Sequence, residues 1–207
     1  MRQYLVLAST SPRRKELLQQ IGVPFTQLSI DINEDVKPNE NARQYVLRLA
    51  KEKAAAGYEL LSAEKRVNHV ILAADTTVVC EGQILAKPDS LSQSKEILKQ
   101  LSDREHLVMT AIGFHSADKI LQKVVTTKVK FRSLSNSEIE AYWHTGEPQD
   151  KAGSYGIQGL GAVFVEALEG SYSNVVGLPL CETAQLLNQF NIAYWQESSN
   201  ASVENTL

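Results

Sequence analysis

The chain has 207 residues, a hydrophobic share of 43% and a formal net charge of −3 at pH 7. This length can bury a core of its own, and we expect one domain over residues 1–195 followed by a flexible tail over residues 196–207. The charges form no basic stripe, which argues against a nucleic-acid polymer as partner. The first apolar run is too short for a signal peptide or a membrane span, so we expect no membrane contact and a cytoplasmic location.

The N-terminal part of the chain predicts a buried strand followed by a capped helix. Tyr4–Ala8 is a short apolar run that stops where polar residues and a proline begin. Ser11 is suited to cap a helix that has Pro12 at its first position and ends at Gly22. The loop between the strand and the helix is therefore expected at a helix N-terminus.

A second helix is predicted over Ala42–Ala56. Asn41 precedes it as a cap, its apolar residues recur on one face, and Gly57 follows it as a terminator. This assignment places Lys53 near the helix C-terminus, where a positive charge also suits the helix dipole.

The middle of the chain predicts a strand that polar residues interrupt. Val70–Ala74 is apolar, the sequence Asp75-Thr76-Thr77 follows, and Val78–Cys80 resumes an extended pattern. Further along, His106–His115 and Ile120–Phe131 predict the arms of a long hairpin. Further helices are predicted from Ser90 through Leu101, from Ser135 toward Thr145, and over Leu180–Phe190. Helices that alternate with strands around a hairpin predict an α/β fold with a mixed sheet.

The loop from residue 9 to residue 14 has the composition of a phosphate site. Ser9 and Ser11 bring hydroxyl groups to a helix N-terminus, where the helix dipole favours an anion. Arg13 and Arg14 add guanidinium groups, which pair with phosphate oxygens. An ordinary capped helix with two solvated arginines accounts for these residues equally well.

Two acidic residues are candidates for metal or proton chemistry. Asp75 follows a very apolar run, and a carboxylate there is costly unless it serves a metal, a positive partner or a proton transfer. Glu34 could supply a second hard oxygen ligand for a divalent cation. The alternatives are an Asx turn at Asp75 and a solvated acidic loop around Glu34.

The segment Glu147–Gly161 carries repeated glycines, which allow a backbone to approach a ligand closely. Its spacing matches neither the P-loop nor the dinucleotide fingerprint. Gln158 lies within it, and an amide that both donates and accepts suits the edge of a pyrimidine base. The two remaining basic candidates, Lys53 and Lys87, are uninformative on their own.

Taken together and in order, these strings resemble the Maf family of nucleotide pyrophosphatases. The resemblance rests on Leu7–Arg14, Ala74–Thr76, Lys87-Pro88, Asp150–Gly153 and Tyr155–Gly159. It extends from about Leu5 to the last predicted helix, so it is far more specific than any one motif.

Three positions resemble one branch of that family. Arg13, Thr76 and Gln158 match the branch that acts on dTTP and UTP, whereas the branch that acts on 7-methyl-GTP typically has Trp, Gln and Glu there. The resemblance thus implies pyrimidine nucleoside triphosphates as substrates, and we expect the three side chains to converge on the base.

The resemblance also implies two lobes about a central sheet, a nucleotide cleft and a possible homodimer. By this analogy Asp75 is the general base that activates water, and Glu34 and Asp75 hold a divalent cation, Mg²⁺ or Mn²⁺. Arg14, Lys53 and Lys87 then offset the charge of the triphosphate. The alternatives are a modified nucleotide as substrate, or a nucleotide-binding regulator of septum formation and cell division.

Overall fold

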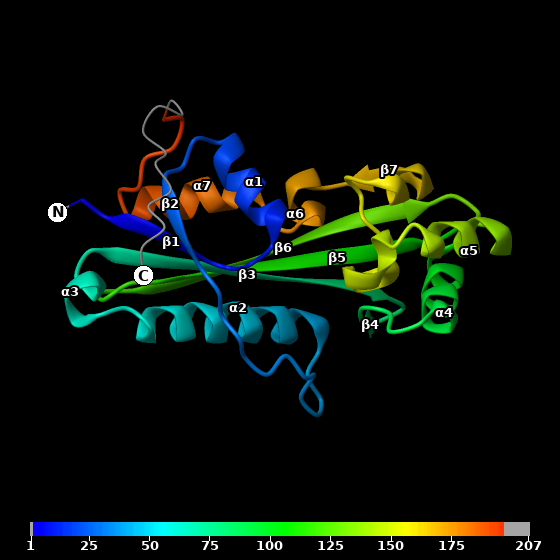
Figure 1. The fold of residues 1–207 in the computed structure, drawn as a ribbon, viewed down its shortest axis with the longest axis horizontal. Helices are drawn as coiled ribbons and strands as arrows, with labels where there is room; N and C mark the ends of the chain where they lie inside the picture. Colours follow the sequence, from blue (N-terminus) through cyan, green and yellow to red (C-terminus); the bar gives the residue numbers. More distant parts are fainter. Residues whose placement is uncertain (1, 197–207) are drawn as a thin grey trace.

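The structure, a computed structural model, describes residues 2–196 and is built on one seven-stranded sheet (Figure 1). Its strands are β1 (Tyr4–Ala8), β2 (Phe25–Leu28), β3 (His69–Cys80), β4 (Gln83–Leu85), β5 (Glu105–His115), β6 (Ile120–Phe131) and β7 (Val165–Glu169). Their order is β2-β1-β3-β5-β6-β7, and β4 pairs with β3. The first three strands in this order are parallel and the other pairs are antiparallel, so the predicted mixed sheet is confirmed.

Helices cover both faces of the sheet. They are α1 (Pro12–Gln20), α2 (Ala42–Glu59), α3 (Ala63–Arg66), α4 (Leu91–Leu101), α5 (Asn136–His144), α6 (Tyr172–Val176) and α7 (Leu180–Gln189). Figure 1 shows α2 along one face, α1, α6 and α7 over the opposite face, and α4 and α5 at the far end of the molecule. Short 3₁₀ turns occupy Glu147–Asp150, Ala152–Ser154 and Leu160–Phe164.

Strand alternation assigns the core to these layers. In β1, Leu5 and Leu7 join the core on the side of α1 and α7, whereas Val6 and Ala8 join the core beneath α2. A separate cluster that contains Phe131 lies with α4 and α5 at the far end. The sheet therefore runs through two lobes with distinct cores.

Several predicted elements differ from the structure. The strand is not interrupted after Ala74, because Asp75, Thr76 and Thr77 continue β3 in register with β5. Helix α2 continues to Glu59 with Gly57 inside it, so Lys53 is well within the helix. Strands β2, β4 and β7 and the short helices α3 and α6 were not predicted. The predicted tail, apart from residue 196, lies outside the described residues.

One edge of β3 lacks a neighbour over part of its length. Strand β1 pairs with β3 as far as Leu72, and β4 pairs with it only from Val78. In the described chain, no strand pairs with that edge between these two positions. The open edge contains Asp75, and the loop after β1 ends beside it. None of the helices within residues 2–196 combines the length and the apolar character needed to cross a membrane.

Helix α2 lies unusually close to β5 at Gly113. A Cβ atom on Gly113 would be 2.8 Å from the carbonyl oxygen of Ala50 and 3.1 Å from its carbonyl carbon. Because these are backbone atoms of a buried helix, they cannot move aside as a side chain would. Glycine at this position therefore fixes the distance between the sheet and the helix that carries Lys53.

We expect Gly113→Ala to lower the free energy of unfolding by about 1–3 kcal/mol, because the added methyl group pushes α2 away from β5. Urea denaturation of the two proteins measures the difference. Adding Ala50→Gly should not rescue stability, since the clash is with the backbone carbonyl and not with the Ala50 methyl group. A variant as stable as the parent would contradict this account of the packing.

Candidate active site

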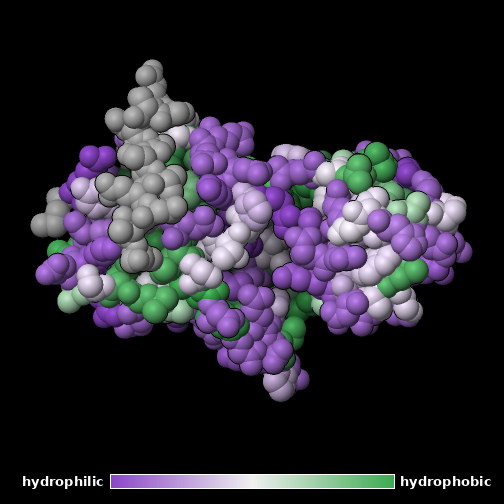
Figure 2. Space-filling model, viewed as in Figure 1, coloured by the Kyte–Doolittle hydropathy of each residue, from purple (hydrophilic) through white to green (hydrophobic). Residues whose placement is uncertain are grey.

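A cavity of about 920 Å³ opens at the unpaired edge of β3, a size within the range of small-molecule sites. Figure 2 shows hydrophilic residues around the narrow middle of the molecule, between its two halves. All the predicted site residues line the cavity. They are Ser9, Ser11, Arg13, Arg14, Glu34, Lys53, Asp75, Thr76, Lys87 and Gln158.

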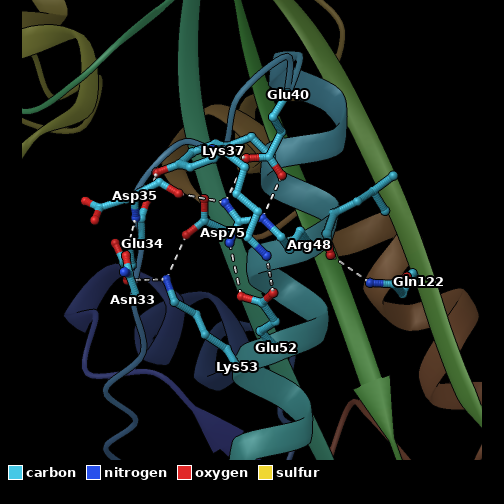
Figure 3. Close-up of polar contacts among 12 residues, drawn as sticks. Asn33, Glu34, Asp35, Lys37, Glu40, Arg48, Glu52, Lys53, Asp75 and Gln122 are labelled. Atoms are coloured by element: carbon cyan, nitrogen blue, oxygen red, sulfur yellow. Dashed lines mark hydrogen bonds and ion pairs between the residues drawn. The ribbon is translucent and has the colours of Figure 1, made fainter.

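Asp75 and Lys53 form a buried ion pair on the α2 side of the sheet. By strand alternation Asp75 faces the same side as Ile71 and Ala73, which pack beneath α2. Helix α2 brings Lys53 to that position, and its Nζ donates to Asp75 Oδ1 at 2.7 Å. The same Nζ is 2.6 Å from Glu34 Oε1, so one ammonium group bridges two carboxylates (Figure 3). Asp75 is thus part of a charged cluster and not of an Asx turn.

Thr76 faces the opposite side of the sheet, where α1 supplies Arg14. Arg14 Nη2 donates to Thr76 Oγ1 at 3.2 Å, Nη1 donates to Ser9 Oγ at 3.2 Å, and Nε donates to the Gly177 carbonyl at 2.9 Å. These three neutral acceptors hold the guanidinium plane at the cavity wall without cancelling its charge. The predicted phosphate loop and the open edge of β3 therefore meet through Arg14.

The hydroxyl proton of Thr76 is already committed within the protein. Thr110 Oγ1 donates to the Asn174 carbonyl at 2.8 Å, because a carbonyl oxygen can only accept. Thr76 is 2.9 Å from Thr110 Oγ1, so Thr76 must be the donor in that pair while it accepts from Arg14. In this arrangement Thr76 has no proton left to donate to a nucleotide base, and its oxygen holds Arg14 at the cavity wall.

Burial and charge act in opposite directions on the acidic groups. Burial raises the pKa of Asp75, although the positive charges of Lys53 and Arg14 work against that rise. Partial burial would also raise the pKa of Glu34, but its bond to Lys53 and nearby cations outweigh this effect and lower the pKa. Burial lowers the pKa of Arg14 in spite of Asp75. Asp75 is thus the carboxylate best disposed to take a proton.

The first loop is tied to β2 and to its own backbone. Ser9 Oγ accepts the backbone N–H of Ser11 at 3.2 Å, and Gln27 Nε2 donates to the Ser9 carbonyl at 2.6 Å. Ser11 precedes α1 but makes no side-chain cap bond. Arg13 and the exposed Lys87 line the cavity from α1 and from the segment after β4. Cations therefore approach the cavity from four parts of the chain, namely α1, α2, the segment after β4 and, with Lys151, the segment between the first two 3₁₀ turns.

The glycine segment is organised by Glu147. Its carboxylate accepts from the Tyr142 hydroxyl at 2.7 Å and from the backbone N–H groups of Leu160 at 2.7 Å and Gly161 at 3.0 Å. A Cβ atom on Gly159 would be 2.1 Å from Glu147 Oε2, so any other residue there requires the Glu147 carboxylate to move from its hydrogen bonds. Gln158, beside it, remains exposed on the cavity.

The carboxylate groups in the cavity could bind a divalent cation that enters together with a nucleotide. Among residues 2–196 there is no group of three or more His, Cys, Asp or Glu side chains that could hold a metal ion. Magnesium is usually held by one or two carboxylates together with substrate phosphates, and seldom by a cage made of protein alone. Glu34 and Asp75, which share Lys53, match that two-carboxylate arrangement.

Sequence reasoning missed three residues that shape the site. Tyr45 donates its hydroxyl to the Glu34 carbonyl at 3.0 Å, Gln27 fixes the first loop, and Glu147 fixes the glycine segment. Each bonds to backbone groups of residues remote in sequence, and such bonds leave no recognisable pattern in a sequence. Only Glu147 could have been identified from the sequence, because it is an acidic residue at the start of a glycine-rich segment whose backbone N–H groups need acceptors.

Known proteins resemble this chain over most of its length. The profile of a family described as "Maf-like protein" matches residues 4–190. A dTTP/UTP pyrophosphatase of Vibrio vulnificus strain YJ016 is 55% identical over 186 residues, covering 90% of this chain and 98% of the relative. Those of Pseudoalteromonas atlantica and Hahella chejuensis are 52% and 49% identical, covering 92% and 95% of this chain and 98% and 96% of theirs. The chain belongs to the Maf family.

Proposed function

We propose that this protein hydrolyses dTTP and UTP to the nucleoside monophosphate and pyrophosphate. The observation that carries the proposal is the buried Asp75 carboxylate, which lies 2.7 Å from Lys53 in a cavity lined by further cations. A triphosphate needs such cations, and a water molecule that attacks phosphorus needs a base. The similarity to relatives named dTTP/UTP pyrophosphatase supports the choice of substrate.

In the proposed reaction Asp75 takes a proton from the attacking water. The water oxygen bonds to the α-phosphorus, the bond from that phosphorus to the α,β-bridging oxygen breaks, and pyrophosphate leaves with the bonding electrons. Burial raises the pKa of Asp75, which makes it a stronger base than a solvated carboxylate. Lys53 keeps the carboxylate oriented and bears positive charge beside the phosphates.

The remaining groups divide between the two ends of the nucleotide. Arg14 and Lys87 offset phosphate charge, and Thr76 serves by holding Arg14 in place. Arg13 and Gln158 line the cavity without such commitments and are assigned to the base end. A divalent cation, Mg²⁺ or Mn²⁺, would be held by Glu34 and Asp75 and would neutralise charge on the phosphates. A homodimer, which the family resemblance implies, and a cytoplasmic location are parts of the same proposal.

A nucleotide panel tests the function. We expect pyrophosphate release from dTTP and UTP in Mg²⁺ or Mn²⁺, and its reversible loss in excess EDTA, because protein cations alone offset the triphosphate poorly. Full activity in EDTA would exclude the metal. Preference for a modified nucleotide would change the substrate assignment, and tight binding without release under any divalent ion would favour a regulator.

We expect Asp75→Asn to lower kcat by about two to four orders of magnitude while the protein still folds, as removal of a general base would. Lys53 retains Glu34 as a partner in the variant, so its charge is not left alone. Single-turnover kinetics and thermal denaturation measure the two effects. Asp118→Asn, a change of the same kind in the β5–β6 turn, serves as control. Retained activity, or a fall in kcat that is matched by a loss of thermal stability, would contradict the assignment of Asp75 as the general base.

We expect Gln158→Glu to change substrate ratios more than overall chemistry. The carboxylate cannot donate a hydrogen bond, and each unpaired group at a buried base edge costs roughly 1–3 kcal/mol. The kcat/KM values for dTTP and UTP should therefore fall relative to that for 7-methyl-GTP. Gln149→Glu adds the same charge to the same segment, at a residue that does not line the cavity, and is the matched control. If kcat/KM fell by the same factor for dTTP, UTP and 7-methyl-GTP, a role of Gln158 in base selection would be contradicted.

A further inference from the structure

The loop that carries Glu34 contains neither helix nor strand. It joins β2 to α2 through residues 29–41, and only a turn at residues 38–39 interrupts its irregular path. Nevertheless Glu34 is held 2.6 Å from Lys53 although almost half of its side chain, 48%, is exposed. Exposed ion pairs of this kind contribute little stability, so this contact alone cannot fix the loop.

Arg48 of α2 forms hydrogen bonds with two residues of this loop, Glu40 and Asp35. Its Nε and Nη2 donate to the two carboxylate oxygens of Glu40 at 2.6 and 2.8 Å, and Nη2 also donates to the Asp35 carbonyl at 2.9 Å (Figure 3). Its Nη1 donates to Glu52 at 3.1 Å, one helical turn further along α2. The Arg48 side chain is only 14% exposed and that of Glu40 only 8%. A planar guanidinium with several fixed donors can make all these bonds at once, which a lysine cannot.

Tyr45, one helical turn before Arg48, holds the adjacent peptide. Its hydroxyl donates to the Glu34 carbonyl at 3.0 Å, so two successive carbonyls of the loop, those of Glu34 and Asp35, are bonded from one face of α2. The Glu40 carboxylate in turn accepts the backbone N–H of Lys37 at 3.0 Å. The bond to Arg48 lowers the pKa of Glu40 to about 2, so these contacts stay charged at any physiological pH.

We propose that Arg48 is a positioning residue that holds the loop so that Glu34 stays at Lys53 and faces the cavity. The role of Glu34 in catalysis rests on the proposed function. The part in which Arg48 holds the loop rests on the contacts alone. Arg48 itself does not line the cavity. Without it, Lys53 pairs with Asp75 alone, and the second carboxylate moves away from the phosphates. Loss of a group that orients a site ligand typically costs 10–100-fold in activity, and we expect that range here.

The test combines a double-mutant cycle with hydrogen exchange. Arg48→Met should lower kcat/KM for dTTP by about 10–100-fold, and the double variant Arg48→Met with Glu34→Gln should be no worse than Glu34→Gln alone, because both changes remove one interaction. Amide exchange in residues 31–40, followed by mass spectrometry without nucleotide or metal, should accelerate by about tenfold. Arg48→Lys provides the same tests with the charge retained, in case Arg48→Met folds poorly.

Arg66→Met is the matched control. Arg66 also bonds backbone carbonyls, those of Tyr58 and Glu59 in the last turn of α2 and of Leu61 after it, and it pairs with Glu59 at 2.8 Å, but it does so at the opposite end of α2. Its loss should leave exchange in residues 31–40 and kcat/KM unchanged. Unchanged exchange in both Arg48 variants, or losses that multiply in the double variant, would overturn the proposal. If the parent protein released no pyrophosphate, the proposed function would fail, while the exchange data would still decide whether Arg48 holds the loop.

Discussion

The buried ion pair between Asp75 and Lys53 is the interaction on which the charged site in the cleft depends. A carboxylate with 9% of its side chain exposed, in the middle of a sheet, is strongly unfavourable unless a cation meets it. That cation has to come from α2, and Gly113 lets α2 approach β5 closely enough to bring it. Because Lys53 has a second partner in Glu34, the pair is also in contact with the irregular loop before α2.

The cleft itself results from strand lengths. Strand β1 ends before β3 does, and β4 begins to pair with β3 only further along, so the edge of β3 between them is open. Alternation along that edge sends Asp75 toward α2 and Thr76 toward α1. Two consecutive residues thereby connect the cation of one layer, Lys53, to that of the other, Arg14. The two charged walls of the cavity are thus fixed by a single stretch of backbone.

Much of this fold follows from local sequence signals. Asn41 caps α2 as predicted, the helix predicted from Ser135 toward Thr145 forms as α5 with Ser135 as its cap, and the long hairpin lies where its β-branched residues place it. Strand β2 was not predicted because it is short and its middle residues are exposed, so it shows no apolar run. The continuity of β3 was missed because Asp75-Thr76-Thr77 has the composition of a turn, and only tertiary partners make it favourable as a strand.

The candidate site was predicted less evenly. Motif resemblance selected residues that line one cavity, yet it could not show which of them bond to one another. Thr76 illustrates this point, since its bonds to Arg14 and Thr110 depend on how three elements pack. The contacts of Arg48 and Glu147 are with backbone groups remote in sequence, and side-chain identities alone carry no information about such partners.

The contact between Glu147 and Gly159 constrains how this binding site can evolve. With a Cβ on residue 159 only 2.1 Å from Glu147 Oε2, neither position can change alone without disturbing the loop that both hold. Residue 158 is under no such restriction, because its side chain faces the cavity. A substitution at 158 can therefore alter the cavity wall without disturbing this loop, whereas a side chain at 159 requires the Glu147 carboxylate to move.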